Sequence, residues 1–559
     1  MKSKKIYRAI LCVLVLSLFI NMNSFVGYSE SKWAEVPNVT VDINGVIVNN
    51  NTLKYPLVLI DGHFYYPLTW ELVKMIGYTS HYTPESGLRL TKANTDIKAN
   101  ITALSIGKSK ITKSVLPVHY NVAIDDVSIV VKRPLYNLSG VTYLPINDTS
   151  VIGLTASYSI DQGLSIRPSK SITTLPKQFN TYDQLDINKL IRSQGTASTC
   201  WAFAANTLFE VAIAKTTNEY NDFSEDHLIN NTPIPANYES GGNFLMSSIY
   251  FQNKLGPVYE NLAPIGSQSK GKRYEVPYTL LNYEEINNDL VATKRAIFEN
   301  GATLSSLYLN ELDKKVYNSK TYAYYNPDIK LKKTHELVLI GWDDAYNKDN
   351  FTIKPKRNGA FIAQNSFGNS WGDKGFFYIS YEDVHILEQV YSITAFEPIK
   401  SNARQYLYDQ TGITHFESYG AENNGIAVNN YTSISDEILK RISIYTPENN
   451  MEISLYYGNG LFKKMLGSPR YIVKIANKGY HTIDLPITLS LAEKDSFWIA
   501  AEYVGKTPFL MPIEAPYPGI GYSMTGNRGE GFIGDGNTFS DILDIRNHAS
   551  IGLRATTFK

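Results

Sequence analysis

The side chains best suited to covalent chemistry surround Cys200, within the stretch Gln-Gly-Thr-Ala-Ser-Thr-Cys-Trp-Ala-Phe at residues 194–203. Ser198 or Thr199 can cap a helix that begins here, which places the Cys200 sulfur in the first turn. Unpaired backbone amides and the helix dipole favour a thiolate at that position. A cysteine nucleophile also needs an imidazole and a donor for the developing oxyanion. The amide of Gln194, on the loop that enters the helix, could be that donor.

An imidazole and a polar partner for it stand in two later segments. Of the nine histidines, His335 lies 135 residues after Cys200 and precedes the apolar run 337–340. Asn365 follows within Gln-Asn-Ser-Phe-Gly-Asn-Ser-Trp-Gly at residues 364–372. The other histidines have no metal-ligand spacing to one another, so no zinc site is predicted.

Together these segments resemble the papain family of cysteine peptidases, over about residues 175–395. In that family the nucleophile lies in Cys-Gly-Ser/Ala-Cys-Trp/Tyr, with the histidine and asparagine roughly 130–150 residues downstream. The resemblance implies that Cys200 is the nucleophile, His335 the acid/base and Asn365 the residue that orients His335. It also implies that Gln194 is the oxyanion donor.

The same resemblance implies which residues meet the substrate. Gly241-Gly242 is similar to the family's segment whose backbone pairs with an extended peptide. Trp371 would shield the asparagine–histidine pair from water. Such a mechanism requires no metal and no cofactor.

Several residues depart from the family pattern. Ala197 replaces the first motif cysteine, so the usual disulfide is missing there. Glu336 stands where a small residue is usual, and it could shift the pKa of the imidazole or alter preference beside the scissile bond. Phe367 replaces the usual tryptophan, and residues 343–358 are a polar insertion predicted to form an exposed loop near the cleft. These departures bear on substrate preference and leave every catalytic group in place.

Two helices are predicted to hold these groups. Residues 200–214 are apolar around nearly the whole circumference, which indicates a buried helix. Residues 289–300 are amphipathic, with Asn288 as the predicted cap and Gly301 as the stop.

Strand-like apolar runs follow at residues 337–340 and 376–379. The middle of the chain, residues 177–398, is therefore predicted to be an α+β domain. The papain resemblance implies the form of that domain, a helical half packed against a β-barrel-like half.

Residues 30–167 are predicted to be an all-β region built from two copies of one small unit. For example, Tyr-Pro-Leu at residues 55–57 returns as Arg-Pro-Leu at residues 133–135. The region resembles the copper amine oxidase N-terminal-like domain of secreted Gram-positive proteins, which is a non-catalytic module. Residues 168–176 are polar and are predicted to be a linker where a zymogen would be processed.

Residues 399–559 return to short strands, at 442–445, 453–456 and 497–500, and this spacing predicts a β-sandwich. The region resembles the lectin-like domain that follows papain-like peptidases in clostridial and related surface proteins. That resemblance implies a cell-wall or surface glycan as a partner.

Two further motifs carry weaker chemical signals. Gly-Asn-Ser-Trp-Gly at residues 368–372 matches the nucleophile elbow of serine hydrolases, but a strand is predicted after it where that elbow needs a helix. Asp535 and Asp541 could bind a structural calcium ion in the C-terminal domain, although the loop pattern of calcium sites is missing.

Composition excludes other classes of protein. Hydrophobic residues make up 43% of the chain, which excludes a largely disordered chain. The 53 basic residues match 53 acidic ones, so no basic excess points to nucleic acid.

An apolar run at residues 9–20 follows four basic residues and is too short to span a membrane. It predicts a signal peptide at residues 1–29 and an exported protein without a membrane span after signal removal.

These features predict a secreted or cell-surface, papain-like cysteine endopeptidase. It would hydrolyse peptide bonds of protein or peptide substrates through an acyl-enzyme on Cys200, with His335 as acid/base. Two alternatives stay open. One is a catalytically inactive surface-binding or adhesion protein, and the other is a transpeptidase that passes the acyl group to an amine on a surface protein.

Overall fold

The computed structural model describes residues 34–559 with internal gaps. The stretches within this range that it does not describe are 84–86, 93–115, 118–121, 125–126, 129–134, 147–153, 160–162, 169–173, 187–188, 311–312, 419–423, 506–509 and 517–525. The predicted signal peptide, residues 1–29, lies outside the described residues, as does the centre of the predicted linker, residues 168–176.

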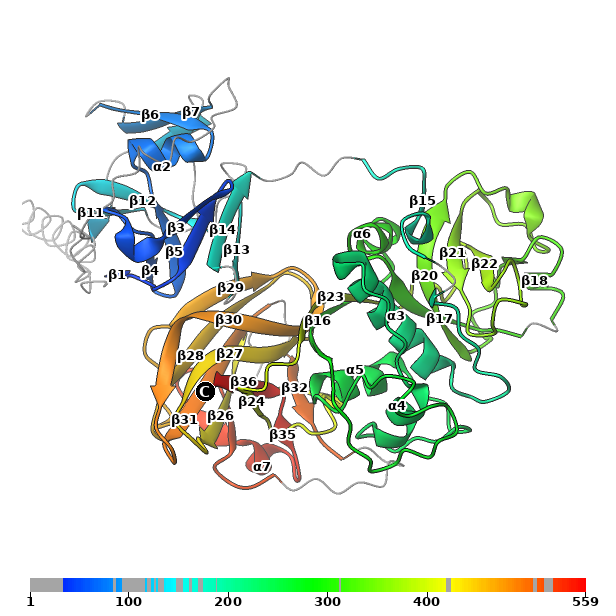
Figure 1. Cartoon of the computed structure of the whole chain (residues 1–559). Helices are drawn as coiled ribbons and strands as arrows, with labels where there is room; N and C mark the ends of the chain where they lie inside the picture. Colours follow the sequence, from blue (N-terminus) through cyan, green and yellow to red (C-terminus); the bar gives the residue numbers. More distant parts are fainter. Residues whose placement is uncertain are drawn as a thin grey trace, which may run out of the picture. The chain divides into compact units, whose positions relative to one another are not determined.

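Strands dominate the described chain and helices are few, as Figure 1 shows. The predicted multidomain fold, with an α+β domain between two β-rich regions, is confirmed. The chain packs as two units, one ending at Pro168 and the other containing Ser169–Lys559.

In the first unit, the two sequence copies form equivalent hairpins. The first copy contributes β4 (Val58–Ile60) and β5 (His63–Pro67), and the second contributes β11 (Tyr136–Leu138) and β12 (Val141–Pro145). Both hairpins turn through two residues at positive φ, the geometry that matches the twist of the flanking strands. β5 and β12 pair antiparallel at the centre of a six-stranded sheet.

Each sequence copy also contributes a strand that pairs with a strand of the other copy. β7 (Gly87–Lys92) of the first copy pairs in parallel with β9 (Val122–Ile124) of the second. β14 (Gly163–Pro168) of the second copy pairs in parallel with β2 (Thr40–Ile43) of the first. The two copies are therefore interlocked. The resemblance of this unit to the copper amine oxidase module stays a prediction.

The helical half of the middle domain is built on α3 (Cys200–Thr217), with α4 (Glu225–Asn231) and α5 (Phe244–Gln252) beside it. All side chains of residues 201–214 are buried, which confirms the predicted buried helix. A helix that is apolar all round needs neighbours on every side, and α3 packs on both of these helices and on the sheet.

The amphipathic helix is α6 (Leu290–Asn300), and it ends at Gly301 with φ +94° as predicted. The prediction that Asn288 caps it is wrong by one residue. Asn288 has φ +53°, whereas the extended Asp289 accepts a hydrogen bond of 2.9 Å from the backbone N–H of Ala292. A cap needs this extended conformation for its side chain to reach the first turn.

The strand half of this domain places two predicted site residues at the same end of one hairpin. β20 (His335–Asp343) pairs antiparallel with β21 (Ala360–Gln364), with Val338 opposite Gln364. His335 therefore begins its strand where β21 ends, and Asn365 is the next residue of the chain.

The polar insertion lies at the opposite end of that hairpin. Residues 343–358 connect the end of β20 to the start of β21, so the predicted position near the cleft is wrong. Eight residue steps along β20 separate Asp343 from His335, or about 26 Å at the usual rise of a strand. Since the insertion is at the far end of a continuous ladder, it does not border His335.

A single sheet runs from the middle domain into the C-terminal domain. β16 (Tyr278–Ile286) pairs on one side with β23 (Val390–Pro398) and on the other with β30 (Lys478–Leu491), within a 13-stranded sheet. The Thr482 backbone N–H donates to Asn282 Oδ1 at 2.8 Å across this junction. The two domains are therefore joined by backbone pairing as well as by side chains.

The C-terminal domain places a second sheet against this one, as the predicted β-sandwich requires. β27 (Glu437–Thr446) and β36 (Leu553–Phe558) continue the shared sheet from β30, and β26 (Asn424–Thr432) and β31 (Ser496–Val504) form the centre of a six-stranded sheet. Both of these last strands pack on β36. No helix among the described residues has the length and apolar character needed to cross a membrane.

Replacing Gly479 with alanine is expected to weaken the junction of the two domains. The added Cβ would lie 2.1 Å from the carbonyl oxygen of Tyr283, at a φ of +148°. We expect the free energy of unfolding to fall by about 2–4 kcal/mol, measured by urea denaturation. Gly467→Ala is the matched control, because its Cβ meets open space. Equal unfolding midpoints for the two variants would contradict a stabilising role for the junction.

Candidate active site

Cys200 is the first residue of α3 and is partly buried. Thr199 is the capping residue, but it caps through its backbone alone. Its carbonyl accepts hydrogen bonds from the backbone N–H groups of Ala202 and Phe203, at 2.9 and 3.3 Å. The Thr199 hydroxyl is buried without a hydrogen-bond partner among the described residues, so the predicted side-chain cap is not formed.

His335 and Asn365 form a buried hydrogen-bonded pair. His335 Nε2 lies 2.7 Å from Asn365 Oδ1. The backbone N–H of Ser366 also donates to that oxygen, at 2.8 Å, and this identifies the atom as the carbonyl oxygen because a backbone N–H can only donate. His335 must then carry its proton on Nε2. In the neutral ring the lone pair is left on Nδ1, which can act as a base.

Aromatic rings cover this pair. The Phe367 ring lies 5.2 Å from the imidazole of His335, centre to centre. Trp371 packs edge-on against Phe367 at 5.4 Å and stacks on Tyr317 at 5.6 Å. The shielding role predicted for Trp371 stays a prediction, but its geometry is that of a second layer behind Phe367.

Gln194 is tied to the same cluster by three hydrogen bonds. Its backbone N–H donates to the carbonyl of Ser366 at 2.8 Å, and its side-chain carbonyl accepts from the Ser366 hydroxyl. Its side-chain Nε2 donates to the carbonyl of Ala197 at 2.6 Å. An amide nitrogen carries two N–H groups, so one can serve a substrate oxyanion.

The Gly241-Gly242 segment lies against the residue that follows the nucleophile. A Cβ on Gly242 would fall 2.5 Å from the buried ring of Trp201, so only glycine fits here. The next residue, Asn243, caps α5 by accepting from the backbone N–H of Met246 at 3.2 Å. Gly242 therefore lies beside the start of α3, and the segment leads directly into α5.

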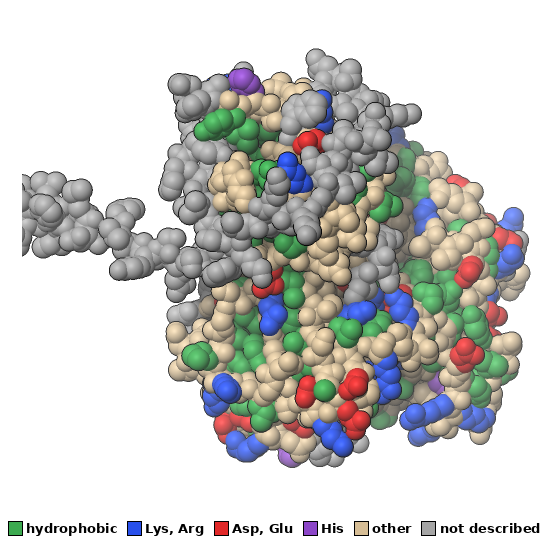
Figure 2. All heavy atoms as spheres, turned by 60° about the vertical axis from the view of Figure 1, so that its left-hand side comes forward, with side chains coloured by type: hydrophobic (Ala, Val, Ile, Leu, Met, Phe, Trp, Pro, Cys, Tyr) green, Lys and Arg blue, Asp and Glu red, His purple; other side chains and the backbone are tan. Residues whose placement is uncertain are grey.

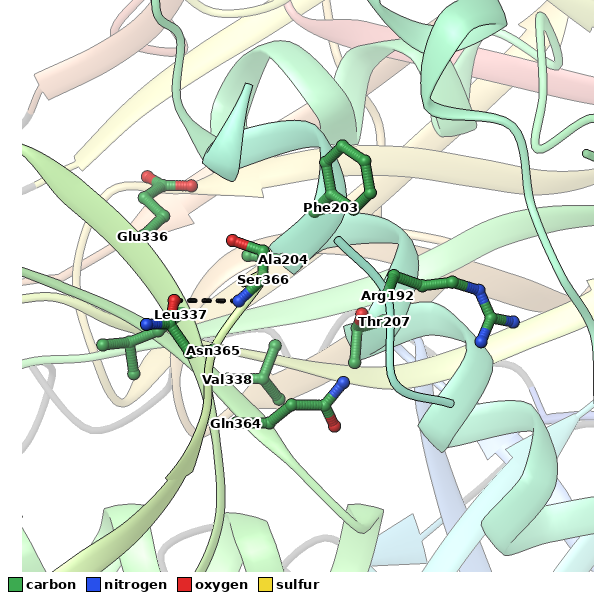
Figure 3. A pocket seen from close by; sticks show the side chains of 10 residues that line it. All are labelled: Arg192, Phe203, Ala204, Thr207, Glu336, Leu337, Val338, Gln364, Asn365 and Ser366. Carbon is green, nitrogen blue, oxygen red and sulfur yellow. Dashed lines mark hydrogen bonds between the residues drawn. The ribbon is translucent and has the colours of Figure 1, made fainter. Parts of the chain in front are cut away.

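Glu336 is a buried carboxyl next to these groups. One of its oxygens accepts from the backbone N–H of Phe244 at 3.3 Å, and the other has no hydrogen-bond partner among the described residues. Figure 3 shows Glu336 with Asn365 and Ser366 among the residues that line a small pocket between α3 and the β20–β21 hairpin. Burial raises the pKa of Glu336 to about 8, so the carboxyl is mainly neutral at pH 7.

Burial favours the uncharged forms of Cys200 and His335. It raises the pKa of the Cys200 thiol. Hydrogen bonding by the backbone amide of Glu336 partly offsets this rise, whereas repulsion by the Glu336 carboxylate adds to it. Burial lowers the pKa of His335 to about 4, against the opposing effect of its bond to Asn365. The imidazole is thus neutral at pH 7 and able to accept a proton. The thiolate predicted from the helix end is opposed by this burial.

The structure links most of the predicted site residues, and Ser366 is the link that sequence reasoning missed. Ser366 bonds to Gln194 and to Asn365, and Asn365 bonds to His335. The backbone amide of Glu336, the residue after His335, acts to lower the pKa of the Cys200 thiol. The only sequence signal for Ser366 is its position directly after Asn365, because its partners are distant in the chain.

The candidate calcium ligands are used in local hydrogen bonds. Asp535 Oδ1 accepts from the backbone N–H groups of Asn537 and Thr538, at 2.9 and 2.7 Å. Asp541 caps a short helix by accepting from the backbone N–H of Leu543 at 3.0 Å. Over the described part of the chain, no group of three His, Cys, Asp or Glu side chains could hold a metal ion.

Two family models match the chain. Residues 175–394 match the papain family cysteine protease model, and residues 405–557 match a lectin-like domain model. Two solved structures of Cwp84 are similar to the chain at 22% identity. One, titled as a clostridial cysteine protease after propeptide cleavage, has a TM-score of 0.61 and covers 68% of this chain and 99% of its own.

The other structure contains the cysteine protease and lectin-like domains of Cwp84, described as a surface layer associated protein of Clostridium difficile. Its TM-score is 0.59, and the match covers 69% of this chain and 90% of that one. At 22% identity, the similarity to these two structures establishes the fold alone.

Curated relatives match part of the chain. They include a cysteine protease of Blomia tropicalis, 24% identical over 224 residues, and cathepsin K of Mus musculus, 25% identical over 229 residues. These matches cover 37% and 38% of this chain, and 61% and 66% of the relatives' own lengths.

Glu336→Gln is expected to change thiol reactivity only in alkaline solution. Above the Glu336 pKa of about 8 its negative charge raises the pKa of Cys200, and the glutamine variant lacks this charge. Alkylation of Cys200 by iodoacetamide should be equal in both proteins at pH 6.5 and roughly threefold faster in the variant at pH 9. The exposed Glu493→Gln serves as control. The same rate ratio at both pH values would refute the assignment.

Proposed function

Because residues 175–394 form a papain-family cysteine protease domain and residues 405–557 a lectin-like domain, we propose that the protein is a secreted or cell-surface cysteine endopeptidase. Its nucleophile is Cys200, its acid/base His335, its orienting residue Asn365 and its oxyanion donor Gln194. The observation that carries this proposal is the buried hydrogen bond of 2.7 Å between His335 and Asn365, which leaves Nδ1 as the basic nitrogen.

In the first step, His335 Nδ1 removes the proton of the Cys200 thiol as the sulfur attacks the peptide carbonyl carbon. The carbonyl oxygen becomes an oxyanion, which the free N–H of the Gln194 amide and the backbone amide at the start of α3 stabilise. These donors are already held in place, Gln194 by its bonds to Ala197 and Ser366. Little reorganisation is then needed when the charge forms.

In the second step, the protonated His335 donates its Nδ1 proton to the leaving amine, and the C–N bond breaks to leave a thioester on Cys200. Water then attacks the thioester carbonyl carbon while His335 Nδ1 accepts its proton. The C–S bond breaks to release the acid product, and His335 returns the proton to the Cys200 sulfur. Asn365 favours the imidazolium at each stage, because its bond to Nε2 opposes the effect of burial on the pKa of His335. Phe367 limits access of bulk water to that bond.

The same comparisons support a proposal for the location of the protein and for its partners. Cwp84 is described as surface layer associated, and its protease and lectin-like domains have the same fold as this chain. We therefore place this protein outside the cell or at its surface, acting on protein or peptide substrates. The lectin-like domain is its candidate contact with a cell-wall or surface glycan.

Covalent labelling of the full chain tests the proposed nucleophile. An epoxide inhibitor of papain-like enzymes should add one adduct, seen by intact mass, and should abolish cleavage of a denatured protein substrate. Cys200→Ala should show no adduct and no cleavage. A Ser370→Ala control should keep both, because the serine-elbow motif is not expected to carry the reaction.

A folded protein that gives no adduct and no cleavage would contradict the peptidase and favour the surface-binding alternative. Adding an amine acceptor separates hydrolysis from transpeptidation. Products with a greater mass than the hydrolysis products would favour the transpeptidase. Hydrolysis products alone support the endopeptidase.

Gln194→Ala is expected to lower kcat by about 100-fold with a small change in KM, since the lost N–H acts on the oxyanion and not on the bound substrate. Single-turnover acylation of a peptide ester measures this effect. A change confined to KM would show that Gln194 binds substrate in its ground state.

A further inference from the structure

A cavity of about 160 Å³ lies between the protease domain and the lectin-like domain. One wall is the face of α5 that carries Leu245, Ser248 and Ile249. The start of the lectin-like domain also lines the cavity, through Ile413 and Phe416. The Phe416 side chain is 45% exposed, so the cavity opens to the surface at this residue.

The walls of this cavity are held rigidly. β16 and β30, which supply its floor, are neighbours in the shared sheet, with Glu285 opposite Lys478. Gly412 packs so closely on Ile249 that a Cβ there would fall 2.5 Å from the isoleucine side chain. The Tyr445 hydroxyl, on the lectin-like side, donates to Gln252 at the end of α5. The walls of the cavity therefore hold one another in place.

The charges in the lining are paired with each other. Glu285 Oε1 accepts from Lys478 Nζ at 2.9 Å and from Gln389 Nε2 at 3.2 Å. The remaining lining is mainly aliphatic and aromatic. A charged occupant would lose its hydration without gaining a partner, so the cavity favours an uncharged, apolar group.

The size of the cavity sets the size of the occupant. A cavity of about 150 Å³ lined by Leu, Ile and Phe binds one benzene ring, whereas sites for whole small molecules have about 300–1,000 Å³. The space found here therefore matches a single aromatic or branched aliphatic side chain.

The cavity is close to the predicted substrate segment. Gly242 touches Trp201, the residue after Cys200, and Leu245 follows Gly242 by three residues. Three Cα–Cα steps span at most about 11 Å. An extended peptide advances about 3.3 Å per residue, so a peptide that pairs with Gly241-Gly242 and continues toward Leu245 would need about three further residues to reach the cavity.

We propose that this cavity is a substrate subsite built jointly by the two domains, which accepts one apolar side chain of the peptide a few residues from the scissile bond. The proposal rests on the proposed peptidase function. It gives the lectin-like domain a direct part in peptide selection, through Phe416 and Ile413, that is separate from any glycan contact.

The test compares full-length wild type with two variants of the lining. Phe416→Ala removes one wall, and Leu245→Trp fills the space. Leu510→Ala is the matched control, because Leu510 is 39% exposed on the strand paired with that of Phe416 and does not line the cavity. The substrates are ten-residue peptides with Phe or Asp scanned through each position, and a dipeptide amide too short to reach the cavity.

At one position, wild type should prefer Phe over Asp by about tenfold in kcat/KM. Phe416→Ala and Leu245→Trp should each reduce this preference to about twofold or less, while hydrolysis of the dipeptide amide and all values for Leu510→Ala stay at the wild-type level. The absence of a position-specific preference, or an equal loss on long and short substrates, would overturn the subsite.

Binding without turnover separates this proposal from the peptidase assignment. Fluorescently labelled Phe and Asp peptides are titrated into the full-length Cys200→Ala variant, with and without Phe416→Ala. Tighter binding of the Phe peptide that depends on Phe416 supports the subsite even if wild type proves inactive. Turnover by wild type with equal binding of both peptides refutes the subsite and leaves the peptidase intact.

Discussion

The antiparallel register of β20 and β21 is the constraint on which the candidate site depends, because it brings His335 and Asn365 to the same end of one hairpin. A slip of one residue would turn every side chain of a strand to the other face of the sheet. Burial specifies the register, since Val338 and Ile340 contribute to the core on the α3 side and Leu337 and Leu339 to the core on the other side. The geometry of the candidate site is thus a consequence of how the two cores are packed.

Burial of α3 has two opposing effects on the chemistry. It places Cys200 firmly at a helix start, where backbone amides can stabilise a negative charge. It also removes water, which raises the pKa of Cys200 and lowers that of His335. Burial thus favours a neutral thiol and a neutral imidazole, and Ser366 holds the side chains of Asn365 and Gln194 in one hydrogen-bonded group.

The shared sheet changes what the C-terminal domain can do. A domain attached by a flexible connection could only bring the protease near a target. Backbone pairing of β16 with β30 instead fixes the lectin-like domain beside α5, the helix that follows the predicted substrate segment. A rigid boundary of this kind can hold a preformed cavity whose walls come from both domains.

The sequence alone determined the features that depend on local patterns. These are the order of the Cys200, His335 and Asn365 motifs, the buried helix that starts at Cys200, the stop at Gly301 and the duplicated N-terminal unit. The local pattern also predicted the cap of α6 to within one residue. The cap is Asp289 and not Asn288, because Asp289 has the extended backbone conformation that a cap needs. Only the tertiary structure decided the position of the insertion at residues 343–358, the role of Ser366 as a link, the interlocking of the two copies and the cavity between the domains. Each of these depends on which strands pair and which faces meet, and such contacts join residues far apart in the chain.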